Sequence, residues 1–205
     1  MAALYPPGLR HFAFPFIFWM GTAVGHATTI IAPSFDELVA QTDYAVHAVV
    51  KSVSCEWRSS GKNLHIVTKV ELEIKEVILG QPPVPLVLEM LGGKIGDRQL
   101  VVDGAPDFKV GDEDMLFVHG NGSQASPLVA FGHGRYPVAR DKKNGRAYVT
   151  RSNGDLLYAT SEVARPMQSS SGARELKVGT QPLSPDSFVA KVRESRKLHP
   201  AAHEN

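Results

Sequence analysis

Histidines are the side chains of this chain with the most evident capacity for chemistry. The sequence contains eight of them, together with 21 aspartates and glutamates. Imidazole and carboxylate groups are the usual ligands of a hydrolytic metal centre. A metal-dependent hydrolase is therefore one hypothesis, and its dispersed candidate ligands are His47, His65, His119, His133 and Asp107.

The spacing of these residues gives that hypothesis little local support. The sequence lacks HExxH, the pair of histidines one helical turn apart that many zinc hydrolases use. His47 and His65 fall in strand-like runs, whereas His133 lies between two glycines, which let a backbone approach a partner closely. We therefore predict no bound metal and no cofactor.

Other catalytic signatures are also missing from the sequence. It contains neither a GxSxG nucleophile elbow nor a GxxxxGK[ST] phosphate loop. Cys55 is the single cysteine, and we interpret it as a buried strand thiol because it has no partner thiol or adjacent base. The run from Asp112 to Asp114 lacks the alternating oxygen ligands of a calcium loop and is interpreted as a charged turn. We expect the protein not to be an enzyme.

The charge balance excludes one class of partner. The 22 lysines and arginines nearly equal the 21 acidic residues, and no basic stripe is evident along the sequence. Binding to a nucleic-acid backbone needs such a stripe or patch. We predict no nucleic-acid partner.

A glycine-rich stretch at residues 86–118, LVLEMLGGKIGDRQLVVDGAPDFKVGDEDMLFV, is the most distinctive part of the sequence. It consists of three apolar, strand-like runs joined by turns that need the positive φ angles open to glycine. Loops of this kind often carry binding residues. The candidate partner-binding residues are Gly92, Gly93, Asp97, Arg98, Asp107 and His133, although each of them also fits a purely structural role.

Alternating patterns elsewhere predict a fold dominated by β-strands. Apolar residues alternate with polar ones from Leu64 to Ile74, which predicts a long, half-buried and curved strand. A β-branched run at residues 44–53 precedes it, and further short strands separated by glycine turns follow. We expect residues 28–160 to form an all-β domain, a closed or partly closed OB-like barrel.

Two short helices are predicted at the borders of this domain. Residues 33–42 carry a capping box, in which Ser34 and Glu37 satisfy each other's backbone donors. Residues 184–198 begin with Ser184 as the N-cap and Pro185 in the first turn, which is typical of a helix start. Between the domain and this second helix, residues 161–183 lack periodicity and are predicted to be a flexible linker.

The first 27 residues have the features of a signal peptide. Residues 12–24 are apolar, and Gly25 and Ala27 supply the small residues that a signal peptidase reads. This apolar run is shorter than a bilayer requires. We therefore expect cleavage near Ala27, export to the periplasm or the medium, and no membrane span in the mature chain.

Three segments resemble a group of exported bacterial proteins of unknown function. They are TTIIAPSFDELVAQTDY, LGGKIGDRQLVVDGAPDFKVGDEDMLFV and FGHGRYPVARD, which lie between Thr28 and Thr150. A similar domain precedes the protease in some bacterial matrixin-type metalloproteases, and residues 184–193 resemble its closing helix. The zinc-binding helix of the protease is missing from this sequence. The resemblance therefore implies the accessory domain without its enzyme.

A looser resemblance links the expected barrel to netrin-like domains and to tissue inhibitors of metalloproteases. Those inhibitors reach the zinc of a protease through an N-terminal cysteine, which the predicted Thr28 end lacks.

These observations favour a non-enzymatic, extracytoplasmic binding or accessory module. Its expected partner is a protein, either a protease or an envelope component. The alternatives are the metal-dependent hydrolase and a structural domain of the envelope. The sequence sets neither the ligand nor the oligomeric state.

Overall fold

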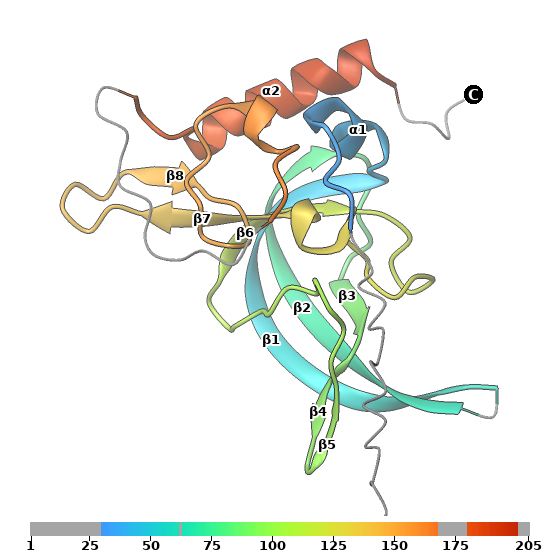
Figure 1. The fold of residues 1–205 in the computed structure, drawn as a ribbon. Helices are drawn as coiled ribbons and strands as arrows, with labels where there is room; N and C mark the ends of the chain where they lie inside the picture. The colour runs from blue at the N-terminus through green and yellow to red at the C-terminus, as the bar shows by residue number, and fades with distance from the viewer. Residues whose placement is uncertain (1–29, 62, 168–179, 201–205) are drawn as a thin grey trace, which may run out of the picture.

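The computed structural model describes residues 30–61, 63–167 and 180–200, and the protein that it shows is mostly β (Figure 1). Six strands form an antiparallel sheet in the order β3-β2-β1-β6-β7-β8, and β4 and β5 form a separate two-stranded ribbon. The bounds are β1 (Tyr44–Ser60), β2 (Asn63–Leu79), β3 (Leu86–Leu91), β4 (Gly93–Ile95), β5 (Arg98–Leu100), β6 (Glu113–Val118), β7 (Arg135–Arg140), β8 (Ala147–Val149), α1 (Phe35–Ala40) and α2 (Pro185–Leu198). The predicted β-rich fold with a helix near each end is confirmed. Because the strand order ends at β3 and at β8, closure into a barrel stays a prediction.

The sheet is built around a long hairpin of β1 and β2. Each of these strands has 17 residues, and they pair from Ala45↔Leu79 to Ser60↔Asn63. Three register shifts interrupt the ladder, between residues 45 and 46, 47 and 48, and 50 and 52. Such bulges bend and twist a strand, which explains how so long a hairpin curves around the core. β1 runs further than the β-branched run at residues 44–53 predicted.

Each face of the sheet covers its own apolar core. On one face, β1, β2 and β3 bury residues that include Val46, Ala48, Val50, Val70, Leu72, Leu86 and Leu88. On the other face, α1 and α2 pack over a second core that includes Leu38, Phe117, Tyr136, Phe188 and Val192. A sheet covered on both faces explains why the first part of β1 is apolar on both sides except at His47.

The two helices contact each other, and a side chain of α2 bonds to the C-terminal end of α1. The predicted capping box is present, since Ser34 N donates to Glu37 Oε2 at 2.8 Å and Glu37 N donates to Ser34 Oγ at 3.3 Å. Arg196 of α2 donates to the carbonyls of Val39 and Thr42, at 2.8 and 2.6 Å. A side chain of α2 thus adds hydrogen bonds to carbonyls at and just after the end of α1.

The ends of the predicted linker are packed against the domain. Val163 is fully buried in the second core, directly after the short 3-10 helix η2 (Thr160–Glu162). Leu183 N donates to Leu157 O at 2.8 Å, and Val149 N donates to Leu183 O at 2.9 Å. Val163 and Leu183 therefore pack in or against the core, although the sequence around them has no helical or strand periodicity. Residues 168–179 of the predicted linker and the predicted signal peptide lie outside the described residues.

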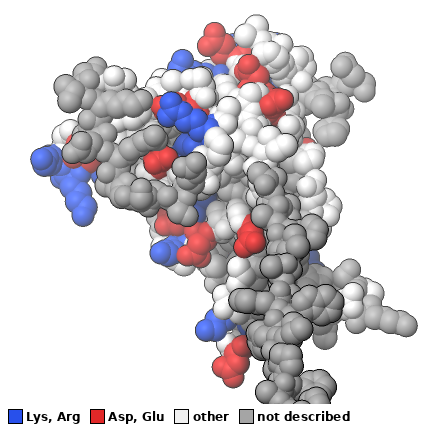
Figure 2. Space-filling model, viewed as in Figure 1, with Lys and Arg blue, Asp and Glu red and all other residues white. Residues whose placement is uncertain are grey.

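Acidic and basic side chains are interspersed over the face seen in Figure 2, and neither sign gathers into a large patch there. Within the described residues, no helix has both the length and the apolar character that a membrane span requires.

Candidate functional site

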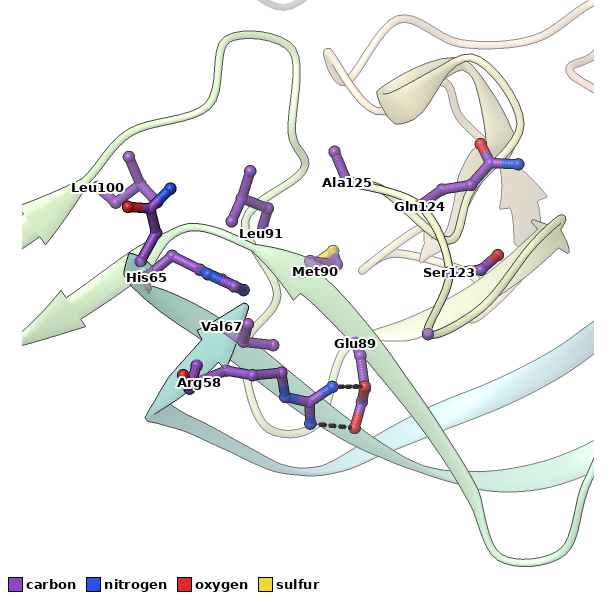
Figure 3. Close-up of a pocket in the computed structure, with 13 residues that line it drawn as sticks. Arg58, His65, Val67, Glu89, Met90, Leu91, Leu100, Ser123, Gln124 and Ala125 are labelled. Atoms are coloured by element: carbon purple, nitrogen blue, oxygen red, sulfur yellow. Dashed lines mark hydrogen bonds and ion pairs between the residues drawn. The ribbon is translucent and has the colours of Figure 1, made fainter. Parts of the chain in front are cut away.

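A pocket of about 590 Å³ lies between the far end of the β1–β2 hairpin, the end of β3 and the loop that follows β6 (Figure 3). Its lining residues are Arg58, Ser59, Asn63, His65, Val67, Glu89, Met90, Leu91, Leu100, Gly122, Ser123, Gln124 and Ala125. The site is therefore built from four separate parts of the chain, namely residues 58–67, 89–91, 100 and 122–125.

Paired charges form one side of this pocket. The Arg58 guanidinium forms two hydrogen bonds with the Glu89 carboxylate, one of them Nη2 to Oε1 at 2.8 Å (Figure 3). Behind this pair, Glu56 lies 3.1 Å from Arg58 and 2.9 Å from Lys69. Hydrogen bonds to Arg58 keep the pKa of Glu89 below its ordinary value, and bonds to Lys69 and Arg58 do the same for Glu56. Two cations and two anions thus neutralise each other beside the pocket.

The register of the strands explains why these charges meet. Arg58 lies opposite His65 across β1 and β2, and Lys69 lies opposite Glu89 across β2 and β3. Successive side chains of a strand point to opposite faces, so the charged residues and His65 come to share one face of the sheet. That face becomes the charged side of the pocket.

The loop after β6 closes the opposite side of the pocket and is fastened to the outer edge of β3. Leu91 N donates to Ala125 O at 2.8 Å. The Asn121 side chain donates to Val87 O at 2.8 Å and accepts from Glu89 N at 3.1 Å. These bonds hold the loop in place, and a preorganised loop lowers the cost of binding a ligand.

The remaining lining residues suit an uncharged, partly apolar group. Val67, Met90, Leu91, Leu100 and Ala125 give the pocket an apolar wall, of which Val67 and Met90 are each 5% exposed. Hydroxyl, amide and imidazole groups lie around it, contributed by Ser59, Asn63, His65, Ser123 and Gln124. Such a mixture is typical of small-molecule and peptide-side-chain sites.

Some of the predicted partner-binding residues gather in a smaller, neighbouring pocket. Gly92, Gly93 and Asp107 line a cavity of about 230 Å³, and Met90 and Leu91 line both this cavity and the larger one. Asp97 and Arg98 are exposed at the turn between β4 and β5 and line neither pocket. Whether any of these residues contacts a partner stays a prediction.

Gly93 has a structural reason to be glycine. Its φ is +128°, and a Cβ atom there would lie 2.5 Å from Thr68 Oγ1 and 2.7 Å from Cys55 Sγ. We expect Gly93→Ala to destabilise the protein by about 1–3 kcal/mol through backbone strain, with the steric clash adding to it. Gly96→Ala is the matched control, because Gly96 also has a positive φ, +56°, but open space around it. Urea unfolding of both variants checks this, and equal losses would contradict the close approach at Gly93.

His133 lies apart from both pockets. It belongs to the short 3-10 helix η1 (Phe131–Gly134) and is 6% exposed. Burial, with a smaller effect of the Arg151 charge, lowers the pKa of His133 to about 4, so the ring is neutral at neutral pH. A Cβ on Gly134 would lie 2.8 Å from Val129 O, so this flanking glycine is required for packing.

The candidate ligands of the hydrolase hypothesis do not converge. His47 Nε2 lies 2.9 Å from Glu113 Oε1, and His119 Nδ1 lies 3.0 Å from Asp43 Oδ1, whereas His65 lines the larger pocket. The described part of the chain holds no group of three or more histidine, cysteine, aspartate or glutamate residues that could bind a metal ion.

Comparison of the chain with protein-family models, with curated proteins and with solved structures gives no match. The resemblance to the domain that precedes matrixin-type proteases therefore stays a prediction.

Proposed function

We propose that the protein is an exported, non-enzymatic binding module, and that the 590 Å³ pocket receives an uncharged, partly apolar group of a protein partner. A protease or an envelope component remains the expected partner. The observation that carries the proposal is the pairing of Arg58, Lys69, Glu56 and Glu89 beside an apolar wall and a polar rim. A charged ligand would have to break these pairs, whereas an uncharged one leaves them intact.

We also propose that the domain is a partly closed barrel. The loop after β6 bonds to the outer edge of β3, and an isolated bridge joins Val118 to Leu128. These contacts support a partly closed barrel in which the loop, rather than a strand, occupies the gap beside β3. The larger pocket lies at this gap. It is therefore open to solvent, with strands on one side and the loop on the other.

Filling the pocket should weaken binding strongly without unfolding the protein. Ala125 is an exposed loop residue that lines the pocket, so Ala125→Trp adds an indole ring there. Peptides selected from a random phage-displayed library on the purified chain should bind this variant at least about tenfold more weakly, the equivalent of 1.4 kcal/mol. Fluorescence anisotropy of the labelled peptides measures the difference.

Val110→Trp is the matched control, because Val110 is 68% exposed and lines neither pocket. It introduces the same ring and should leave the peptide affinity unchanged. Equal affinities for wild type and Ala125→Trp, or a library that yields no peptide, would count against the proposed function.

A further inference from the structure

β2 extends beyond the strand that covers its outer edge. β3 pairs with β2 from Leu72↔Leu86 to Val67↔Leu91, and Gly92 N then donates the last hydrogen bond, to Ile66 O at 2.8 Å. Gly92 and Gly93, both at positive φ, lead the chain away from this edge into β4. Among the described residues, no strand pairs with residues 63–65 of β2 on that side. The far ends of β1 and β2 project beyond the rest of the sheet (Figure 1).

Within the described part of the chain, the N–H and C=O of Leu64 have no partner at this edge. The bond from Gly92 shows that Ile66 O points away from β1. In an antiparallel ladder, the groups that point out of one edge recur at every second residue. The N–H and C=O of Leu64 therefore point out of the same edge as Ile66 O. An open edge of this kind is a template for another strand.

Both faces beside this edge offer contacts to side chains. His65 and Arg58, which are opposite each other, line the larger pocket on one face. Leu64 and Trp57 belong to the other face and are 68% and 47% exposed, so both present apolar surface beside the edge. A strand added to the edge would send alternate side chains to the two faces.

We propose that the occupant of the pocket is an extended segment of a partner polypeptide that pairs with the edge of β2 at Leu64. One side chain of this segment enters the pocket, and its neighbours along the segment contact Leu64 and Trp57. The segment is uncharged where it enters, because the charges of the pocket are already paired. This inference rests on the proposed function and adds the mode of recognition, which is the addition of a strand to a free sheet edge.

Leu64→Pro tests the backbone bond. Proline has no N–H, and because that of Leu64 points away from β1, its loss removes no bond of the β1–β2 ladder. The peptide selected on wild type should bind this variant about tenfold more weakly. The peptide carbonyl that accepts from the Leu64 N–H would be buried without a hydrogen bond. Leu64→Thr keeps the N–H and should weaken binding by a smaller factor.

Amide hydrogen exchange tests the same bond in the unaltered protein. Exchange of the Leu64 amide should slow when the selected peptide is added. If Ala125→Trp weakens binding while Leu64→Pro does not, and the peptide leaves the Leu64 exchange rate unchanged, the pocket binds a ligand but strand addition is wrong. If none of these changes matters, the proposed function itself fails. Protection of Leu64 that rises with protein concentration and needs no peptide would assign the edge to a second copy and overturn the inference.

Discussion

Arg135→Met is expected to lower the free energy of unfolding by about 3–5 kcal/mol at neutral pH, because it leaves a buried carboxylate without its partner. Asp114 is fully buried in β6, and its two carboxylate oxygens accept from Arg135 at 2.8 and 3.0 Å. The same guanidinium donates to Asp112 at 2.7 Å and to the carbonyl of Asp107. It also lies 4.3 Å from the centre of the Phe108 ring. One side chain thus fixes much of the loop between β5 and β6.

The loss of unfolding free energy in Arg135→Met should become smaller as the pH falls. Burial raises the pKa of Asp114 above its ordinary value, and the Arg135 charge opposes this rise. Without Arg135 the pKa in the folded state rises further above that of the unfolded chain. A raised pKa contributes stability that is complete below the unfolded value and is lost as the pH rises through the folded value. The deficit is therefore full at neutral pH and smaller in acid, where the Asp114 carboxyl is protonated. Urea unfolding at a series of pH values measures it.

Two further variants separate this explanation from a general loss of charge. Adding Asp114→Asn to Arg135→Met should recover part of the stability, because no carboxylate is then buried alone. Arg140→Met removes a pair between exposed Arg140 and Glu113, which are 2.8 Å apart, and should cost no more than about 1 kcal/mol. A deficit that is independent of pH, or an equal cost for Arg140→Met, would show that the buried pair is not the cause.

The contrast between Asp114 and the helix caps shows which features a sequence can predict. The capping box of Ser34 and Glu37 is local, since both partners lie within one helical turn, and the structure confirms it. The acidic run ending at Asp114 was expected to form a charged turn, and this expectation is wrong for Asp114, which is buried in β6. Its partner Arg135 lies 21 positions away. The burial depends on that pairing, which no local pattern encodes.

The candidate pocket was missed for the same reason. Arg58 and Glu89 are 31 positions apart, and their contact depends on the register of β1, β2 and β3. The alternation of residues 64–74 correctly predicted that Ile66, Val70 and Leu72 are buried. It could not show that Leu64, on the same face, would stay exposed, because that depends on where β3 ends. The free edge is a property of two strands with unequal lengths.

Phe188→Ala is expected to lower the free energy of unfolding by about 3–5 kcal/mol, as removal of a buried phenylalanine usually does. Phe188 is fully buried on the inner side of α2. Its ring centre lies 5.0 Å from that of Tyr136, 5.8 Å from that of Phe35 and 6.0 Å from that of Phe117. The ring joins α2 to α1 and to both β6 and β7. Thermal and urea unfolding should therefore show one cooperative transition with a lower midpoint.

Leu198→Ala on the same helix is the matched control, because Leu198 is 70% exposed and its truncation should change stability by no more than about 0.5 kcal/mol. Below its transition, Phe188→Ala should still bind the selected peptide with the affinity of wild type. None of the residues that line the larger pocket belongs to α1 or α2. β1 and β2 contribute residues within 58–67 to the pocket, at the hairpin tip. A separate early transition of α2, with the sheet unaffected, would instead show that residues 184–198 form an appendage rather than part of the core. A loss of peptide affinity would show that α2 helps to shape the pocket.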